Sequence, residues 1–226
     1  MTVPALSTRW ALHVALGCGA LVAAAWLFAP ALREFLQHGI VAEADRQVAA
    51  WLHSRTTPPL VEFMRGVSFL HGTAGILAMT ALAALVLRHE GSPLGLPALV
   101  VAVPGGLLLN VVVKHAVQRA RPDWGYALQA LGSFSFPSGH TAGATLFYGV
   151  IVVWLWPRWR QMRERVAALT AAAAMVLLVG ASRIVLGVHF LSDCIGAVIE
   201  AGVWLAICLP GAHLRGKPSS AAPDGS

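Results

Sequence analysis

The chain has 226 residues, of which 57% are hydrophobic and 12% are charged, and its formal net charge is +6. About a quarter of the residues in a soluble globular domain are charged, so this composition excludes that class and indicates an integral membrane protein. The positive residues are dispersed between apolar runs, which argues against nucleic-acid binding and relates the charge to membrane topology.

The apolar runs predict an all-α, polytopic fold with six transmembrane helices. Trp10 to Ala31 contains no charged residue and is longer than the apolar region of a signal peptide, so we expect an uncleaved first span. The other five predicted spans are Gly66 to Leu87, Leu94 to Val113, Thr141 to Trp156, Val166 to Ala181 and Phe190 to Leu209. We expect one domain over residues 1–210, and the composition of residues 211–226 predicts a disordered cytoplasmic tail.

The segment between the first two spans, Glu34 to Met64, has a different pattern. Charged residues, Asp45 among them, alternate with an apolar stripe, and Thr56-Thr57-Pro58-Pro59 interrupts it. The stripe consists of Val41, Ala44, Val48, Trp51 and Leu52. We therefore predict an amphipathic helix that lies at the membrane surface.

The distribution of arginines predicts which side of the membrane each loop occupies. The loop between the fourth and fifth spans holds four of them in a short stretch, namely Arg158, Arg160, Arg163 and Arg165. The positive-inside rule makes this side cytoplasmic. The polar residues at the opposite ends of the spans then share the outer face, which predicts one site there; they are Lys114, His140, Arg183, His189 and Asp193.

Three cations in this set predict an anion site. Arginine holds two oxygens of a phosphate with its planar fork, whereas lysine supplies a point charge. Lys114, Arg121 and Arg183, together with the backbone amides of Ser138 and Gly139 at a helix start, suit a multiply charged oxyanion such as phosphate.

Two histidines can divide the work of phosphoryl transfer. His189 lies four residues before Asp193, so on a helix the carboxylate would share its face and orient the ring. A neutral His189 can attack phosphorus, and a protonated His140 can give its proton to the leaving oxygen.

Three motifs in this order resemble the signature of the type 2 phosphatidic acid phosphatase superfamily. They are Lys-x6-Arg-Pro at 114–122, Pro-Ser-Gly-His at 137–140 and Ser-Arg-x3-Gly-x-His-x3-Asp at 182–193. The resemblance implies a six-span membrane phosphatase that needs no metal or other cofactor. It implies that His189 is the nucleophile, Asp193 its orienting carboxylate and His140 the general acid, with the remaining site residues binding phosphate: Lys114, Arg121, Ser138, Gly139 and Arg183.

The resemblance also implies a lipid phosphate or diphosphate substrate and a place in the bacterial inner membrane, with the site facing the periplasm or exterior. Undecaprenyl diphosphate, phosphatidylglycerophosphate and phosphatidic acid are the candidate substrates, and residues 34–64 either anchor the chain or shape a portal for the lipid. A lipid phosphotransferase with the same intermediate is an alternative, and a non-catalytic lipid-binding or transport protein is another. The sequence leaves the oligomeric state open.

Three further polar residues lie in or beside the predicted spans. We expect Arg119 either to join the phosphate pocket or to meet lipid headgroups. We expect Glu200 to make a hydrogen bond between helices and His71 to be satisfied within the fold rather than to act in catalysis.

Overall fold

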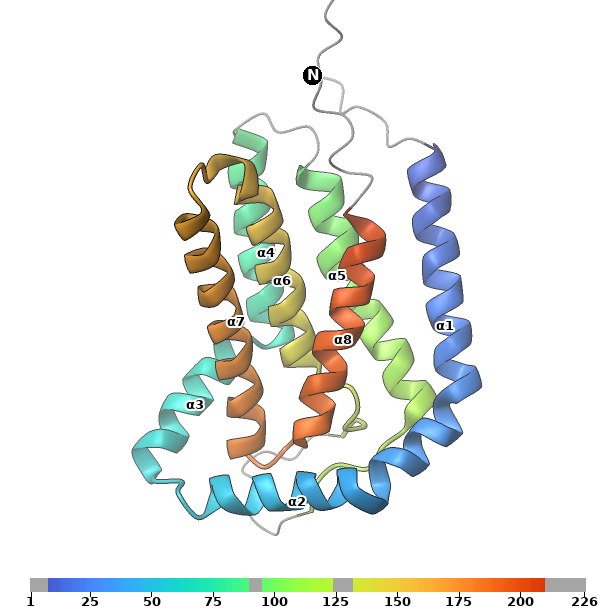
Figure 1. The fold of residues 1–226 in the computed structure, drawn as a ribbon, viewed down its shortest axis with the longest axis vertical. Coiled ribbons are helices and arrows are strands. Elements are labelled where there is room, and N and C mark those ends of the chain that lie inside the picture. Colours follow the sequence, from blue (N-terminus) through green and yellow to red (C-terminus); the bar gives the residue numbers. More distant parts are fainter. Residues whose placement is uncertain (1–7, 90–94, 124–131, 210–226) are drawn as a thin grey trace, which may run out of the picture.

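A computed structural model describes residues 8–89, 95–123 and 132–209, and these residues contain helices but no strand (Figure 1). The predicted tail at 211–226 lies outside the described residues. The first four helices are α1 (Thr8–Gln37), α2 (Gly39–His53), α3 (Pro58–Leu70) and α4 (Thr73–His89). The others are α5 (Gly95–Val117), α6 (Gly139–Leu155), α7 (Met162–Val185) and α8 (Leu191–Cys208), with a short 3-10 turn at Trp156–Arg158.

Five helical segments in the described ranges are long and apolar enough to cross a membrane: Thr8–Gln37, Ala98–Val117, Gly139–Arg158, Met162–Val185 and Leu191–Cys208. A sixth span results if α3 and α4, which are bent by 52° at a short break, are counted together. The predicted all-α, multi-pass membrane fold is confirmed.

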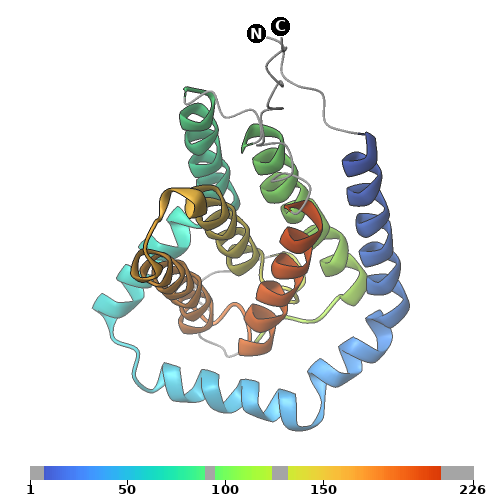
Figure 2. The same cartoon turned by 45° about the horizontal axis from the view of Figure 1, so that its top comes forward.

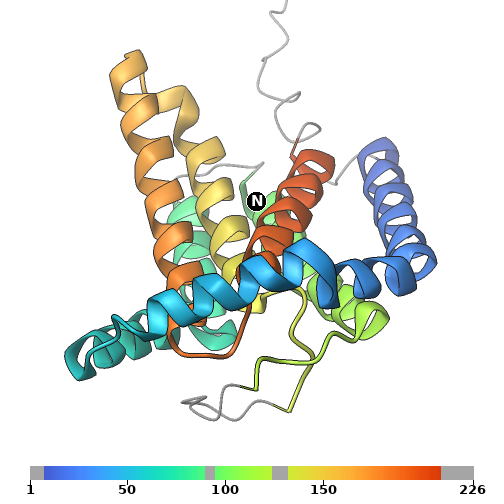
Figure 3. The same ribbon diagram turned by 60° about the horizontal axis from the view of Figure 1, so that its bottom comes forward.

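Helix α6 is at the centre of the bundle, where it packs against α4, α5, α7 and α8 (Figure 2). Helix α1 stands at the side against α5 and α8. Because the chain alternates in direction, α5 and α7 end where α6 and α8 begin, and α2 lies across this same end (Figures 1 and 3). The loops that carry the sequence motifs are thereby gathered at one end of the molecule.

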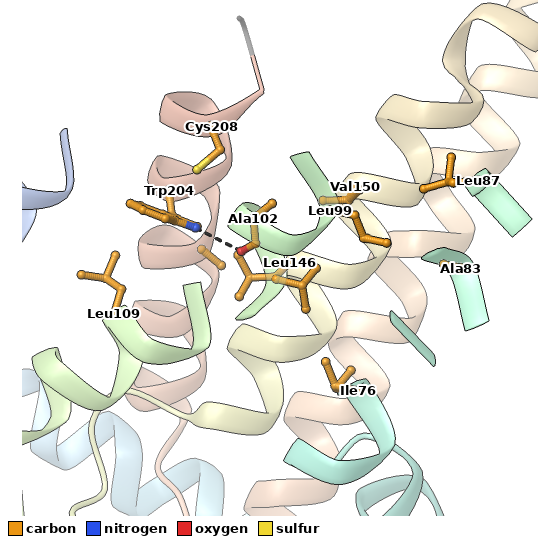
Figure 4. Packing of buried hydrophobic residues seen from close by; sticks show 12 residues of the cluster. Ile76, Ala83, Leu87, Leu99, Ala102, Leu109, Leu146, Val150, Trp204 and Cys208 are labelled. Atoms are coloured by element: carbon orange, nitrogen blue, oxygen red, sulfur yellow. Dashed lines mark hydrogen bonds between the residues drawn. The ribbon is translucent and has the colours of Figure 1, made fainter. Parts of the chain in front are cut away.

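The largest apolar cluster joins α4, α5, α6 and α8 (Figure 4). Helix α5 continues through Pro104, which has no amide hydrogen and loosens the preceding turn. The indole Nε1 of Trp204 donates to the carbonyls of Ala102 (3.0 Å) and Val101 (3.3 Å) in that turn. These hydrogen bonds tie α8 to the turn of α5 that precedes the proline.

The predicted second span is wrong at its start, because the helix breaks after Leu70 and resumes at Thr73. The turn is tight. A Cβ on Gly75 would lie 2.0 Å from the carbonyl oxygen of Leu70, so the bend requires a glycine at this position. Helix α3 therefore belongs with α2 at the end of the bundle, and α4 alone runs along it (Figure 1).

The amphipathic helix predicted within residues 34–64 is present as α2, and the predicted interruption at Thr56–Pro59 separates it from α3. Helix α1 runs on to Gln37, and Gly39, with a φ of +68°, allows the turn into α2. The face of α2 that meets the bundle contains Ala42, Asp45 and Ala49, whereas Trp51 is exposed. The apolar stripe therefore predicts the helix but not its buried face, because that face contains a carboxylate, Asp45.

Two charged residues expected to follow their spans lie inside helices instead. Lys114 and Arg183 are in the last turns of α5 and α7. Apolar length underestimates a helix when its terminal charges have buried partners, and both side chains are buried.

We predict that Gly75→Ala lowers the thermal unfolding midpoint in detergent, because its methyl group would force the α3–α4 turn open at a cost of about 1–3 kcal/mol. Gly66→Ala in α3 is the matched control, since a Cβ there meets nothing within 4 Å. Tryptophan fluorescence during heating measures both. A Gly75→Ala midpoint equal to that of Gly66→Ala would contradict the assigned tight turn.

Candidate active site

The motif residues meet at the end of the bundle that α2 crosses (Figure 3). The last turns of α5 and α7 and the first turns of α6 and α8 contribute side chains. The loops at 118–123, 132–138 and 186–190 complete the site. All three motifs thus reach one location from separate helices, as the sequence predicts.

His189 and Asp193 are in contact, although they do not share a helix face as predicted. His189 is in the turn before α8, and Asp193 is the third residue of that helix. The Asp193 carboxylate accepts the amide hydrogen of Phe190 (2.8 Å) and a hydrogen bond from the Ser135 hydroxyl. His189 Nδ1 lies 3.3 Å from Asp193 Oδ2. Capping of the helix start therefore places the carboxylate beside the imidazole.

His189 is in a state suited to a nucleophile. Burial lowers the pKa of its imidazole to about 4, and the neighbouring Asp193 carboxylate only partly opposes this effect. Arg121 Nη1 lies 3.2 Å from His189 Nε2. Since a guanidinium can only donate, these partners assign the proton to Nδ1 and leave a lone pair on Nε2.

Arg121 and Arg183 place two guanidinium groups in the site. Arg121 is held by the carbonyls of Val188 (2.7 Å) and Ser133 (2.6 Å). Arg183 is fully buried and donates to the hydroxyl of Ser68 in α3. Its Nε and Nη2 atoms have no hydrogen-bond partner among the described residues. Arg183 is close enough to Arg121 for their charges to interact, so a fully buried and a partly exposed guanidinium together make the site positive.

His140 is the second residue of α6 and is partly buried. The charges of Arg183 and His189 both act on its imidazole, so it belongs to the same site. It also lines a cavity of roughly 460 Å³ between α3, the α3–α4 turn and α6. The other lining residues are Arg65, Ser68, Phe69, Gly72, Thr73, Ala74 and Leu186. Both His140 and Ser68, the hydroxyl partner of Arg183, therefore border this cavity.

Lys114 is bound to the loop that precedes α6. Its ammonium donates to the carbonyls of Pro137 (2.7 Å), Phe134 (2.9 Å) and Ser135 (3.3 Å). An ammonium has three hydrogens, so these carbonyls account for all its donors. Lys114 holds the loop that precedes α6, and its charge reaches His189 only through space.

Ser138 and Gly139 are the two residues predicted to offer backbone amides, and the amide of Ser138 already has a partner. The Ser138 amide donates to the main-chain carbonyl of Asp193 (3.1 Å), and its hydroxyl accepts from Thr141 (3.1 Å). Ser138 therefore joins the starts of α6 and α8. At Gly139, the first residue of α6, an added Cβ would lie 3.4 Å from the Asn110 side-chain oxygen, which is an ordinary van der Waals contact.

Sequence analysis missed the position of Arg119 and the role of Asp45. Arg119 is buried and pairs with Asp193 (2.6 Å) and Asp45 (2.8 Å). It also donates to Leu36 O (2.6 Å) and Ser192 Oγ (2.7 Å). The one signal in the sequence was the spacing of Asp45, which lies three residues after Ala42 and four residues before Ala49 and so shares a helix face with these small residues.

Two other polar predictions are confirmed. Asn110 donates to the Glu200 carboxylate (2.7 Å), which is the expected hydrogen bond between helices. His71 has contacts to Val67 O (2.9 Å) and the Tyr148 hydroxyl (2.8 Å), so both its ring nitrogens are satisfied. Among the described residues, no group of three or more His, Cys, Asp or Glu side chains is placed to hold a metal ion.

Comparisons with known proteins agree with this architecture. The sequence model of the PAP2 superfamily matches residues 95–217, more than half of the chain. The chain is 39% identical over 90 residues to phosphatidylglycerophosphatase B of Bacillus subtilis, covering 39% of this chain and 44% of that protein. It is 32% identical over 130 residues to a lipid A 1-phosphatase of Rhizobium johnstonii, covering 53% of this chain and 48% of that protein. The chain thus spans about half the length of the curated relatives it matches.

Two solved structures share the fold. The crystal structure of a transmembrane PAP2-type phosphatidylglycerolphosphate phosphatase from Bacillus subtilis matches with a TM-score of 0.70 and 28% identity, covering 82% of this chain and 93% of that one. Aquifex aeolicus LpxE matches with a TM-score of 0.58 and 20% identity, covering 73% and 94%, which shows a common fold alone.

We predict that Lys114→Met loosens the loop before α6, because three buried carbonyls lose their donor at about 1–3 kcal/mol each. Hydrogen exchange followed by mass spectrometry should show faster exchange at residues 132–138. The control is Arg55→Gln, an exposed cation in the turn after α2. Unchanged exchange at 132–138 in Lys114→Met would contradict this role.

Proposed function

Because the chain belongs to the PAP2 superfamily, we propose that it is a membrane enzyme that hydrolyses a lipid phosphate or diphosphate through a phosphohistidine intermediate. One observation carries the proposal: buried Arg183 keeps two donors without a partner among the described residues, beside Arg121 and His140. Buried donors without partners are costly, so a bound oxyanion would supply what they lack. A phosphoryl group is the oxyanion that two histidines can transfer.

The charges around this point support phosphoryl transfer without a metal ion. Arg121 and Arg183 supply fixed positive charge, and Lys114, bound to the loop before α6, adds a third positive charge at longer range. Together they can stabilise the negative charge on the equatorial oxygens in the transition state. The one carboxylate beside His189, that of Asp193, already has its oxygens engaged by Arg119, Ser135 and the Phe190 amide.

In the first step His189 Nε2 attacks phosphorus. The bond from phosphorus to the leaving oxygen breaks, and that oxygen takes a proton from protonated His140. The Nδ1 proton of His189 stays directed at Asp193, which stabilises the positive charge that develops on the ring. The products of this step are a phosphohistidine and the released lipid alcohol or lipid phosphate.

In the second step water attacks the phosphohistidine. His140, now neutral, takes the proton of the water, and the bond from phosphorus to Nε2 breaks to release inorganic phosphate. His189 returns to its neutral form and His140 to its protonated form. Delivery of the phosphoryl group to water rather than to a second lipid makes this a hydrolase.

The cavity beside His140 supports a lipid leaving group. A general acid must lie next to the oxygen that leaves, so the leaving group occupies the His140 side of the phosphoryl group. This cavity is bordered by Phe69 and Leu186, and Phe69 is 83% exposed at the end of α3. The relatives named for phosphatidylglycerophosphate and lipid A 1-phosphate support a lipid phosphate substrate, and undecaprenyl diphosphate and phosphatidic acid belong to the same chemical class.

The arginine distribution supports a site on the outer face of the membrane. The turn between α6 and α7, with Arg158, Arg160, Arg163 and Arg165, is at the end of the bundle opposite the site (Figure 1). By the positive-inside rule this turn faces the cytoplasm, which directs the site towards the periplasm or exterior.

We predict that the detergent-purified protein releases phosphate from a lipid phosphate in the presence of excess chelator, and that His189→Ala abolishes release. Undecaprenyl diphosphate, phosphatidylglycerophosphate and phosphatidic acid are the substrates to compare. His38→Ala, an exposed histidine at the end of α1, is the matched control and should retain activity. Activity that survives in His189→Ala would overturn the assignment of the nucleophile, and loss of wild-type release with chelator would overturn the metal-free mechanism.

We predict that the acid limb of kcat/KM lies near pH 4 rather than near the ordinary histidine pKa of ~6.5. His189 must be neutral to attack, and burial lowers its pKa to about 4, so protonation of the nucleophile reduces activity as the pH drops through that value. Asp193→Asn should move the limb to lower pH, because the carboxylate favours the protonated imidazole. A limb that stays fixed in this variant would report ionisation of the substrate instead.

A further inference from the structure

Two buried charged residues that are not among the fixed positions of the motifs, Arg119 and Asp45, form a line of ion pairs with the Asp193 carboxylate. Arg119 Nη1 donates to Asp193 Oδ1 (2.6 Å), and Arg119 Nη2 donates to Asp45 Oδ2 (2.8 Å). The exposed fractions of the three side chains are 0% for Asp193, 2% for Asp45 and 3% for Arg119. The line of ion pairs runs from α2 to α8 through a residue of the loop that follows α5.

Asp45 is also fixed to the start of α8 directly. Its carboxylate accepts the amide hydrogen of Ser192 (2.9 Å) and the hydroxyl hydrogen of Ser192 (2.6 Å). The first turn of a helix has free amide hydrogens and a positive dipole end, both of which favour a carboxylate. Helix α2 is therefore docked by charge on the turn that contains Asp193.

The two oxygens of Asp193 have separate partners. Oδ1 accepts from Arg119, while Oδ2 accepts from Ser135 and the Phe190 amide and faces His189 Nδ1. Holding Oδ1 fixes the plane of the carboxylate. That plane decides where Oδ2 lies relative to the imidazole, so Arg119 controls the geometry of the Asp193–His189 contact.

The second carboxylate matters for the charge of the group. Arg119 alone would neutralise Asp193, since the two would form a closed ion pair. With Asp45 on its other side, Arg119 is shared, and the three side chains carry one net negative charge. At low dielectric this remaining charge acts strongly on His189, whose ring must become positive when it is phosphorylated.

We propose that Arg119 and Asp45 are positioning residues, which set the orientation and the effective charge of Asp193 and act through it on His189. The inference rests on the proposed function of His189 as the nucleophile. The other charged or titratable groups that act on the imidazole are Arg121, Lys114 and His140, and all remain in place in the variants below.

The test compares Arg119→Gln, Asp45→Asn and the double variant with the wild type, using kcat, KM and the pH dependence of kcat/KM on phosphatidic acid. Glu43→Gln is the matched control, because it makes the same change from carboxylate to amide on the exposed face of α2, where Glu43 pairs with Arg46. The folded fraction is measured for each variant by thermal unfolding in detergent, so that turnover is expressed per folded protein.

We expect each single variant to lower kcat by up to about 100-fold with little change in KM, since a small displacement of a catalytic group has that effect. The acid limb should move in opposite directions. Arg119→Gln removes a positive charge near His189, which raises the pKa of the imidazole and shifts the limb to higher pH. Asp45→Asn removes the negative charge that offsets Arg119, which lowers this pKa and shifts the limb to lower pH. The double variant should return the limb to its wild-type position while kcat stays low.

Three results would overturn the proposal: limbs that do not move in the single variants, limbs that move in the same direction, or wild-type kcat per folded protein. If a single variant does not fold, the double variant is the test, because it removes both Arg119 and its partner charge. A wild-type kcat in the double variant would then contradict the proposal. Failure of the proposed function is distinguishable, because the wild type itself would then release no phosphate or His189→Ala would remain active.

Discussion

The structure depends on how a carboxylate is kept charged inside a membrane protein. Asp193 is fully buried, and an isolated charge there would be prohibitive, so every donor within reach is used on it. Those donors come from the loop after α5, the loop before α6 and the turn before α8. One side chain thereby joins segments that the bundle packing alone would leave independent. The positions of these loops follow from satisfying this group as much as from apolar contact.

The cations of the site differ from Asp193, because not all of their hydrogen-bonding groups have a partner. Lys114 has all its donors engaged by carbonyls, and Arg121 is held by two, but Arg183 retains unused donors in a fully buried position. Among the cations of the site that the structure describes, Arg183 is thus the one whose side chain keeps donors available to a ligand. The contrast between Lys114 and Arg183 separates a cation that builds the site from one that is available to a ligand, although both belong to the same motif set.

Apolar length and three short motifs were sufficient to predict the all-helical membrane fold and the end of the bundle where the motif residues meet. The α3–α4 bend was not predictable, because it follows from a contact between the Gly75 position and the Leu70 carbonyl rather than from hydropathy. Asp45 was read as one of several surface charges for a related reason. Its partner Arg119 is 74 residues away, and a local helical pattern contains no information on a distant charge. The ring contact of His189 was predicted from spacing, but a helix cap rather than a shared face produces it.

The bend also has a consequence for the surrounding bilayer. Helix α4 has 17 residues, which at ~1.5 Å per residue gives a length of about 25 Å. The hydrocarbon layer is about 30 Å thick, so lipids beside α4 must compress or tilt to match it. The break that begins α4 borders the cavity of His140. A bilayer that thins beside α4 would bring headgroups towards this cavity, which would let a lipid approach His140 while its chains stay in the membrane.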